Sequence, residues 1–280
     1  MIRVREYGTS GPWVTVLHGG PGAMGGMAAV AQGLAGRFRI LEPWQRGSGG
    51  KPLTVARHVV DLHQVVQAYC PGREPTRHPG RRPALVGHSW GAMLALAYAA
   101  AHPDEAGPLV LVGCGTFDPA ARARMRAVRQ ARMDGELRAE LARLEREIED
   151  PDRRLCALGR LMMAVDSCDL ASTEIGLERC DAVAHQETWE DMMWLQGEGV
   201  YPALFALIRS PVLMVHGAAD PHPGRLIRDG LAPYLPQLEY HEWAHCGHYP
   251  WLERAVGDGF FSVVGTWLAR RMPATGEDDA

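Results

Sequence analysis

Hydrophobic and polar positions alternate along the first part of the chain in a pattern that predicts short strands separated by helices. Four short apolar runs are typical of buried strands: residues 14–17, 38–41, 84–86 and 109–112. The segments between them carry apolar residues at helical spacing and predict helices over residues 24–34, 54–68 and 91–101. Residues 1–7 alternate like a further strand. Strand–helix alternation of this kind favours an α/β fold, a mostly parallel sheet flanked by helices on both faces.

The segment over residues 117–207 has a different pattern, with almost no strand signal. Asp118 followed by Pro119 is typical of a helix N-cap with proline at the first helical position. Beyond residue 210 the earlier alternation returns, with strands predicted over 211–216 and 238–241 and helices over 224–232 and 260–268. We therefore predict a core formed by residues 1–116 and 208–280, with a helical cap inserted over residues 117–207.

Composition and charge exclude several classes of protein. With 280 residues, 46% hydrophobic and 22% charged, the chain is typical of a soluble globular protein. A net charge of −4 argues against a nucleic-acid binder. No run approaches the roughly 18 apolar residues of a membrane span, and residues 1–7 do not resemble a signal peptide. No metal-binding or nucleotide-binding motif occurs, so we expect no metal.

The six cysteines are scattered, without a C-x-x-C pair. In a chain of this length the pattern predicts buried free thiols in a reducing compartment, and hence a cytoplasmic protein. Cys156, Cys168 and Cys180 are evenly spaced, but no ligand-rich neighbourhood accompanies them, and we interpret the spacing as coincidence.

The segment Gly87-His88-Ser89-Trp90-Gly91 lies directly between a predicted strand and a predicted helix. G-x-S-x-G in this context forms a strained turn that lifts the serine hydroxyl above the edge of the sheet. Glycines are required on both sides because a Cβ there would collide with the neighbouring strand and helix. The alternative is a glycine-bounded turn with an incidental serine. We predict that Ser89 is a nucleophile.

A serine nucleophile in this architecture is followed in the chain by an acid and a histidine, each after a late strand. Asp220 comes shortly after the predicted strand 211–216, and His248 follows the last strand in a Gly-His turn. The predicted triad is therefore Ser89, Asp220 and His248. Three rivals lie within a predicted strand or helix or lack the Gly-His context: His241, His245 and Asp229.

The glycine-rich segment His18–Gly22 follows the first buried strand directly. Acyl transfer needs two backbone N–H groups directed at the developing oxyanion. We predict that Trp90, the residue after the nucleophile, supplies one and that Gly20 supplies the other; Pro21 has no N–H to donate. The alternative, a phosphate-binding loop, lacks the lysine of a Walker motif.

Together these motifs resemble the α/β-hydrolase superfamily, and within it the proline iminopeptidase-like branch. His18–Gly22 matches the H-G-G-P-G motif of that branch, Gln45–Gly49 matches its D-Q-R-G-x-G turn, and Ser89–Gly91 matches its S-W-G. The resemblance covers residues 12–115 and 211–270. It implies the α/β-hydrolase fold with a helical cap inserted after the strand at 109–113, and no cofactor.

The chain departs from the branch at two positions, with Trp44 in place of aspartate and His88 in place of a common glycine. The resemblance implies that this turn places Arg46 near the nucleophile. A Met- and Trp-rich stretch of the cap predicts either an adaptable apolar acyl pocket or simple packing onto the core: Met162, Met163, Trp189, Met192, Met193 and Trp194. The candidate substrate-binding residues are Trp44, Arg46, Trp189, Glu190 and Met193.

We expect a serine hydrolase that cleaves a small carboxylic ester or amide through an acyl-enzyme. The alternative is an aminopeptidase that releases an N-terminal residue. The glutamates with which such enzymes bind the amine cannot be aligned; Glu187, Glu190 and Glu198 are possible substitutes or solvent-facing residues. An acyltransferase and a non-catalytic binding protein are further alternatives. The expected partner is a small ester, amide or short peptide, without nucleic acid or membrane.

Arginine dominates the basic residues, since Lys51 is the single lysine among 29. Eight arginines crowd the front of the cap, interleaved from Glu136 onward with acidic residues: Arg122, Arg124, Arg126, Arg129, Arg132, Arg138, Arg143 and Arg146. We interpret them as mostly a solvated helix face with i, i+4 ion pairs.

Overall fold

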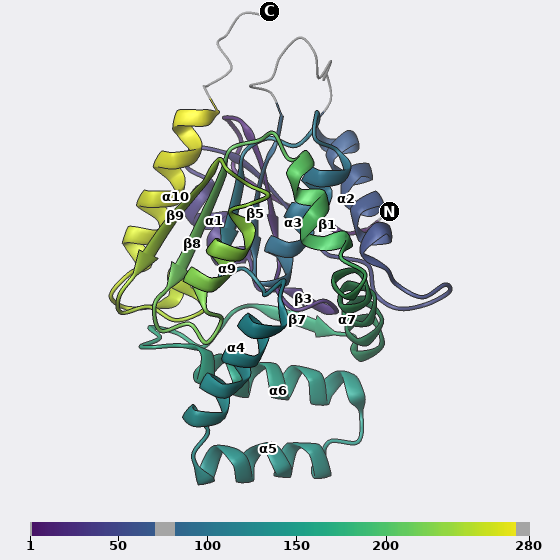
Figure 1. Ribbon diagram of the computed structural model, residues 1–280, viewed down its shortest axis with the longest axis vertical. Coiled ribbons are helices and arrows are strands. Elements are labelled where there is room, and N and C mark those ends of the chain that lie inside the picture. Colours follow the sequence, from purple (N-terminus) through teal and green to yellow (C-terminus); the bar gives the residue numbers. More distant parts are fainter. Residues whose placement is uncertain (1, 71–81, 273–280) are drawn as a thin grey trace, which may run out of the picture.

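The computed structural model describes residues 2–70 and 82–272. A seven-stranded sheet forms the centre of this part of the chain, in the order β1-β4-β2-β5-β6-β8-β9 (Figure 1). Its strands are β1 (Val4–Tyr7), β2 (Trp13–Leu17), β4 (Arg39–Pro43), β5 (Ala84–His88), β6 (Leu109–Val112), β8 (Val212–Gly217) and β9 (Leu238–Trp243). All neighbouring pairs are parallel except β1 with β4. The predicted α/β class is confirmed.

Helices cover both faces of the sheet because both sides of each central strand are apolar. In β6, Leu109 and Leu111 pack on one face, whereas Val110 and Val112 pack on the other. The first face is covered by α2 (Val55–Tyr69), α3 (Trp90–Ala101) and α9 (Gly224–Leu231). The second face is covered by α1 (Ala28–Leu34) and α10 (Gly257–Arg271). The carboxyl ends of β5, β8 and β9, where function was predicted, therefore lie at one edge of a rigid scaffold.

The chain between β6 and β8 is mainly helical, as predicted. It forms α4 (Pro119–Arg132), α5 (Gly135–Glu147), α6 (Pro151–Asp166), β7 (Leu177–Cys180), α7 (Ala182–Gly197), α8 (Val200–Ala203) and η2 (Leu204–Leu207). The Asp118 carboxylate accepts a hydrogen bond from the Ala121 N–H, which confirms the predicted N-cap of α4. Helices α4, α5 and α6 lie at one end of the molecule, with α5 farthest from the sheet (Figure 1). The exact division into core and cap stays a prediction.

The structure corrects the prediction around residue 24, where a helix was expected. Ala23–Gly25 instead forms a short strand, β3, which pairs antiparallel with β7, so the insertion also contains a strand. The backbone explains the difference, because Gly22, Gly25 and Gly26 have φ values of 72°, 97° and 88°, outside the right-handed helical region. The helix begins only at Ala28.

The structure also corrects the prediction for the cysteines. Cys156 of α6 and Cys180 of β7 form a disulfide, with their Cα atoms 5.7 Å apart. Cys168 is exposed, whereas Cys114 and Cys246 are buried thiols. The argument from free thiols to a reducing compartment therefore fails for the bonded pair, and a cytoplasmic location stays a prediction.

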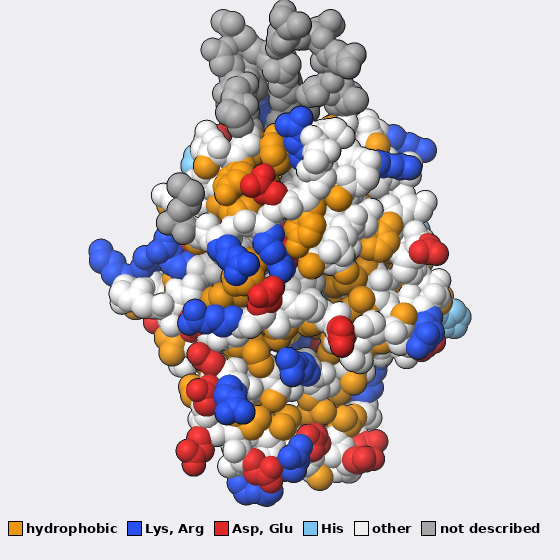
Figure 2. Space-filling model, turned by 180° about the vertical axis from the view of Figure 1, so that it is seen from behind, with side chains coloured by type: hydrophobic (Ala, Val, Ile, Leu, Met, Phe, Trp, Pro, Cys, Tyr) orange, Lys and Arg blue, Asp and Glu red, His pale blue; other side chains and the backbone are white. Residues whose placement is uncertain are grey.

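No helix among the described residues has the length and apolar character needed to cross a membrane. Figure 2 shows acidic and basic side chains side by side at the end of the molecule that α5 forms. There Arg143 donates to Glu140 and Glu147, so this part of the arginine-rich segment is the solvated, ion-paired face that its sequence predicts.

Candidate active site

Ser89 occupies a strained turn between β5 and α3. Its backbone has φ 53° and ψ −114°, and it is the only non-glycine residue with a positive φ in the described part of the chain. A Cβ on Gly87 would lie 2.2 Å from the Gly91 carbonyl oxygen, and one on Gly91 would lie 2.2 Å from that of Leu17. The two glycines thus allow the close packing that holds the serine in this conformation, as the sequence predicts.

Asp220 and His248 meet at the carboxyl ends of β8 and β9. Both side chains are buried, and His248 Nδ1 donates to Asp220 Oδ2 over 2.7 Å. Ser89 and His248 line the same cavity, although the Ser89 hydroxyl forms no hydrogen bond with the described residues. Contacts of a catalytic hydroxyl are often completed only when a substrate binds. The structure therefore brings Ser89 and His248 to one cavity and joins His248 directly to Asp220.

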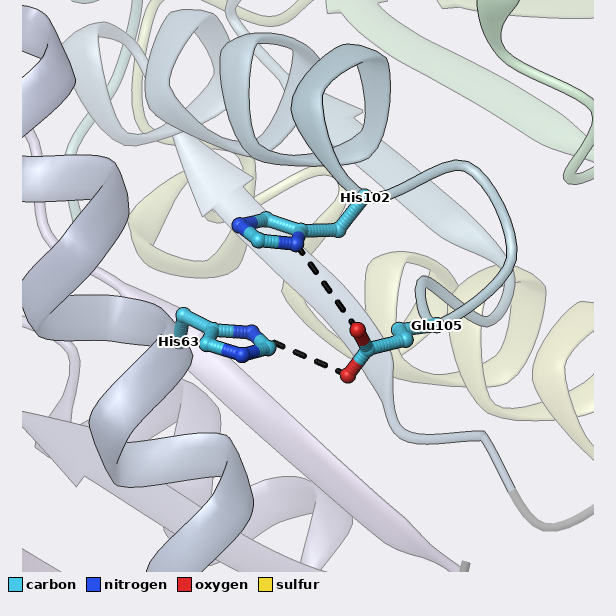
Figure 3. A group of neighbouring side chains, drawn as sticks. All are labelled: His63, His102 and Glu105. Carbon is cyan, nitrogen blue, oxygen red and sulfur yellow. Dashed lines mark ion pairs between the residues drawn. The ribbon is translucent and has the colours of Figure 1, made fainter. Parts of the chain in front are cut away.

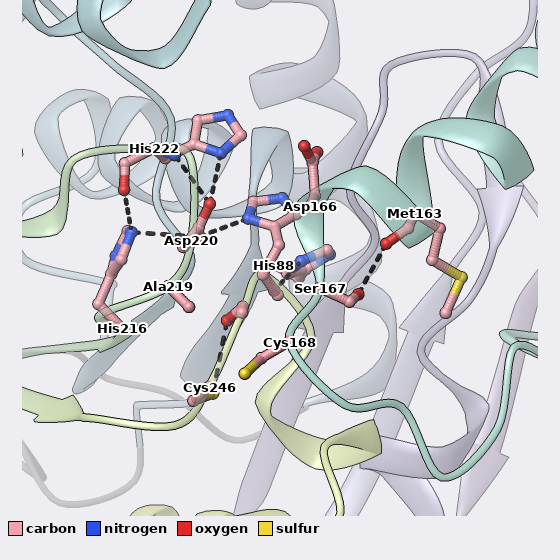
Figure 4. Close-up of polar contacts among 12 residues, drawn as sticks. His88, Met163, Asp166, Ser167, Cys168, His216, Ala219, Asp220, His222 and Cys246 are labelled. Atoms are coloured by element: carbon pink, nitrogen blue, oxygen red, sulfur yellow. Dashed lines mark hydrogen bonds and ion pairs between the residues drawn. The ribbon is translucent and has the colours of Figure 1, made fainter. Parts of the chain in front are cut away.

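Two further histidines, missed in the sequence, contact the Asp220 carboxylate (Figure 4). His222 donates to Oδ1 from its backbone N and from Nδ1, over 2.8 and 2.9 Å, and His216 Nε2 lies 3.1 Å from Oδ2. Burial alone raises the pKa of Asp220, but its interactions with His248, His222 and His216 outweigh burial and hold it well below the ordinary value. The spacing His216-Gly-Ala-Ala-Asp220-Pro-His222 was the available signal.

His88 contacts both the backbone and the ring of His248. Its Nε2 donates to the His248 carbonyl oxygen over 3.0 Å, and its ring lies 4.6 Å from the His248 ring and 4.8 Å from that of Trp251. Burial, followed by the His248 charge, lowers the pKa of His88 well below its ordinary value, so this ring is neutral. The histidine that replaces the common glycine therefore fixes the backbone that carries His248.

The glycine turn after β2 lies beside the serine. Gly19 and Gly20 line the cavity together with Ser89 and Trp90, so both residues predicted to bind an oxyanion belong to its wall. Gly20 has φ 64°, a conformation that favours glycine, and its carbonyl accepts from the Ala23 N–H in a tight turn.

Gln45 connects this turn to the helix that follows the serine. Its side-chain Nε2 donates to the His18 carbonyl over 3.1 Å, and its Oε1 accepts from Trp90 Nε1 over 2.6 Å. The Gln45 backbone N–H also donates to His18 Nε2 over 3.2 Å, which requires a neutral ring. Burial lowers the pKa of His18 to about 4, in agreement with that role. One buried amide thus connects the segments that carry both predicted oxyanion donors.

The cavity over Ser89 has a volume of about 580 Å³, and the inserted helices form its outer walls. Helices α4, α6 and α7 each contribute one face to these walls. The lining residues are Arg122, Met125, Arg126 and Arg129 of α4; Leu155, Leu158, Gly159, Met162 and Asp166 of α6; and His185, Trp189 and Met193 of α7. The i, i+3, i+4, i+7 spacing in α4 is that of one helix face. The arrangement is a mostly apolar chamber with one cationic wall.

The match to known families agrees with this architecture. A family model described as "Alpha/beta hydrolase family" matches residues 16–258. The chain belongs to the alpha/beta hydrolase family. A search of curated proteins finds no match to it.

Solved structures of other alpha/beta hydrolases have the same fold. A proline iminopeptidase from Mycobacterium smegmatis superimposes with a TM-score of 0.60 at 20% identity, covering 96% of this chain and 94% of that one. A thermophilic esterase from Thermogutta terrifontis gives 0.61 at 19%, covering 97% and 94%. A monoacylglycerol lipase from Paleococcus ferrophilus gives 0.57 at 18%, covering 97% and 99%. At this identity the likeness shows the fold alone.

The structure brings only two of the five candidate substrate-binding residues, Trp189 and Met193, to the cavity wall. Arg46 instead binds Asp61 of α2 with two hydrogen bonds of 2.6 and 2.5 Å. The Trp44 ring packs under the Arg3 guanidinium, 4.1 Å from its centre, and Glu190 is exposed. The ion pair of Arg46, the ring contact of Trp44 and the exposed position of Glu190 account for the absence of these three residues from the cavity wall.

The other two glutamates considered as amine ligands also lie elsewhere. Glu187 accepts from the Leu53 N–H over 2.8 Å, and Glu198 is the exposed C-cap of α7. Asp166 is the only carboxylate lining the cavity within the described ranges, and both of its oxygens accept from Arg129.

The interpretation of the cap arginines as mostly a solvated face with i, i+4 ion pairs holds only in part for α4, in which Arg124 and Arg126 are exposed. Arg122, Arg126 and Arg129 line the cavity, and Arg132 donates to the carbonyls of Val165 and Ala219. Unlike α5, α4 contains no acidic residue, so its arginines have no i, i+4 partners within the helix.

Two groups of side chains have the composition of metal ligands. In one, His63 and His102 direct Nδ1 at the two oxygens of Glu105 over 3.7 and 3.8 Å (Figure 3). Their rings are stacked 4.1 Å apart with 3° between the planes, so a single ion cannot lie in the plane of both rings, as imidazole ligation requires. In the other, Asp220 already accepts Nδ1–H bonds from His222 and His248. Neither geometry favours a metal site.

Proposed function

We propose that this alpha/beta hydrolase cleaves small carboxylic esters through a serine-bound acyl intermediate. The observation that carries the proposal is the strained Ser89 at the wall of a mostly apolar cavity that it shares with His248, whose Nδ1 donates a hydrogen bond to Asp220. Esterases and a lipase among the structures of the same fold agree with such chemistry.

In the proposed reaction, Ser89 Oγ attacks the carbonyl carbon of the ester while His248 Nε2 takes the hydroxyl proton. The backbone N–H groups of Gly20 and Trp90 bind the oxyanion of the tetrahedral intermediate. Collapse of this intermediate breaks the bond to the leaving oxygen, which receives the proton from His248. Water, deprotonated by the same histidine, then attacks the acyl carbon and releases the acid and Ser89.

Asp220 would hold His248 in the tautomer that leaves Nε2 free to accept a proton, and it would stabilise the imidazolium that forms. The bonds from His222 and His216 keep the carboxylate ionised in its buried position. The charge needed opposite the imidazolium is thus present before substrate binds.

The charge of the cavity favours an ester over an N-terminal amine. An aminopeptidase must hold a substrate ammonium, which in a low-dielectric site requires a carboxylate partner. The one carboxylate on the described wall, Asp166, is already engaged by Arg129, and two further arginines line the same space. An ammonium ion would therefore be repelled, and the iminopeptidase among the structural relatives does not decide the substrate of this chain.

The test compares 4-nitrophenyl butyrate with prolyl and alanyl naphthylamides, using the full chain and two serine variants. Ser89→Ala should lower kcat on the ester by at least about 10⁴-fold, as loss of a serine nucleophile does. Ser262→Ala, at an exposed position of α10, is the matched control and should leave kcat unchanged. Full turnover by Ser89→Ala, or amide turnover that exceeds ester turnover and requires a free amine, would overturn the proposal.

A further inference from the structure

The cationic wall of the cavity is formed by one face of α4. Arg126 follows Arg122 by four residues and precedes Arg129 by three, which is the spacing of one helix face. All three arginines line the cavity over Ser89. Arg124 belongs to the same helix but does not line the cavity; it is exposed, as is Arg126 at the cavity wall. The guanidinium groups are thus concentrated on the side of α4 that faces the site.

The three guanidinium groups differ in their partners. Arg129 forms a bidentate ion pair with Asp166. Arg122 and Arg126 form no ion pair with a carboxylate in the ranges that the structure describes, and Arg122 binds the neutral amide oxygen of Gln196. Asp118, one turn earlier, attracts Arg122, but its Oδ1 accepts from the Ala121 N–H. Two positive charges at the wall are therefore not neutralised by the protein.

Arg122 lies half-buried near a second positive charge, that of Arg126. Burial, and next the charge of Arg126, lower the pKa of Arg122, which reports its partial desolvation and the repulsion between the two groups. Another part of the cavity wall is apolar, with Leu155, Leu158 and Met162 from α6. Charge interactions are stronger beside such a surface than in water, so an anion placed there would be bound more tightly than at an ordinary surface site.

We propose that the physiological substrate carries an anionic group, held by Arg122 and Arg126, at the end of an apolar acyl chain that lies along α6. This inference rests on the proposed function and specifies the substrate class of the same site. Carboxylate and phosphate oxygens offer guanidinium groups the same acceptors, so both belong to the class. The hydrolysed ester is then the half-ester of a dicarboxylic acid or its phosphonate counterpart.

The experiment measures kcat/KM for two anionic esters, mono-4-nitrophenyl adipate and 4-nitrophenyl 5-phosphonopentanoate, each relative to the neutral 4-nitrophenyl hexanoate. Spontaneous hydrolysis is subtracted for each ester. We expect at least one anionic ester to be preferred by about 10-fold or more, since bonds to charged groups are among the strongest polar contacts. The better anionic ester identifies the group that the site binds.

Arg122→Gln and Arg126→Gln should each lower the ratio of anionic to neutral kcat/KM by about 10-fold. Arg124→Gln, which removes the same charge from the same helix outside the cavity face, should leave the ratio unchanged. The inference is overturned if the wild-type ratio does not exceed one, or if the three variants behave alike. Hexanoate hydrolysis that depends on Ser89, without an anionic preference, would refute this inference while leaving the proposed function standing.

A binding measurement tests the inference without catalysis. The thermal midpoint of the Ser89→Ala protein is compared with 6-phenylhexanoate and with the isosteric neutral 6-phenylhexanamide. The carboxylate should raise the midpoint more than the amide does, and the difference should disappear when Arg122 and Arg126 are both replaced by Gln. Equal stabilisation by the two compounds would overturn the inference, even if none of the esters is hydrolysed.

Discussion

Replacement of Gln45 by Met tests whether one buried amide positions the turn His18–Gly22, which carries the predicted oxyanion donor Gly20. Methionine has a similar size but cannot replace the bond that Gln45 donates to the His18 carbonyl or the one that it accepts from Trp90 Nε1. Each partner left unpaired in a buried site costs about 1–3 kcal/mol, so the loss of two partners should lower the free energy of unfolding by about 2–6 kcal/mol.

Activity should fall as well, because the lost bonds join the turn that carries Gly20 to the helix that begins at Trp90. Complete loss of an oxyanion donor lowers kcat by about 10²–10³-fold, and misplacement should cost a part of this, about 10–10²-fold. If Gln45 positions the two predicted donors, the effect should lie in kcat, with little change in KM.

The assays are steady-state hydrolysis of 4-nitrophenyl butyrate and equilibrium unfolding in urea. Gln67→Met is the matched control, because Gln67 is exposed and its amide donates to Glu105 outside the cavity. This control should change neither kcat nor the free energy of unfolding by more than about 0.5 kcal/mol. A Gln45→Met protein that is destabilised but keeps its wild-type kcat would refute the positioning role.

Three further predictions concern a histidine that contacts Asp220, two buried neutral histidines and the disulfide. His222→Ala removes a donor to Asp220 and a ring stacked 4.4 Å from His248, and kcat for the butyrate ester should fall by about 10-fold. The free energy of unfolding should decrease as the pH is lowered. Burial lowers the pKa of both His18 and His58 to about 4. Between pH 6.5 and 4 the unfolded chain therefore binds protons that the folded chain does not. Each histidine should cost about 3 kcal/mol at pH 4 relative to pH 7.5, measured by urea unfolding at several pH values. Cys156→Ser opens the disulfide to Cys180 and should lower the free energy of unfolding by about 3 kcal/mol, as reductant should do to the wild-type protein.

Each of these predictions has an outcome that contradicts it. Unchanged kcat in His222→Ala would show that the second histidine on Asp220 has no part in catalysis. Stability that is constant between pH 6.5 and 4 would contradict neutral, buried imidazoles at His18 and His58. Reductant that destabilises the Cys156→Ser protein as much as the wild type would mean that the reductant acts elsewhere.

The local signals in the sequence predicted most of the sheet and the turn at Ser89. Runs such as residues 109–112 are strands because both sides of the strand are buried, which leaves an apolar side chain at every position. The sequence also predicted the turn at Ser89, because Gly87 and Gly91 are required by close contacts with neighbouring residues and with β2. The order in the chain and the positions after two late strands then indicated Asp220 and His248, which the structure joins.

The features that were missed depend on contacts between distant segments. The Cys156–Cys180 bond forms because β7 pairs with β3 beside α6, and the spacing of the two cysteines carries no record of this. The role of the α4 arginines depends on which face of that helix is turned toward the sheet. An apolar stripe normally identifies such a face, but here the cavity side carries arginines, so the usual signal is absent.

The most direct test of the central claim is to trap the acyl group on the protein. The full chain is mixed with excess 4-nitrophenyl butyrate, quenched in acid within milliseconds to seconds, and its peptides are analysed by mass spectrometry. We predict a burst of nitrophenol of about one equivalent and a butyryl group on the peptide that contains Ser89. A butyryl group on another residue, or undiminished turnover by Ser89→Ala without any acylated peptide, would contradict the account.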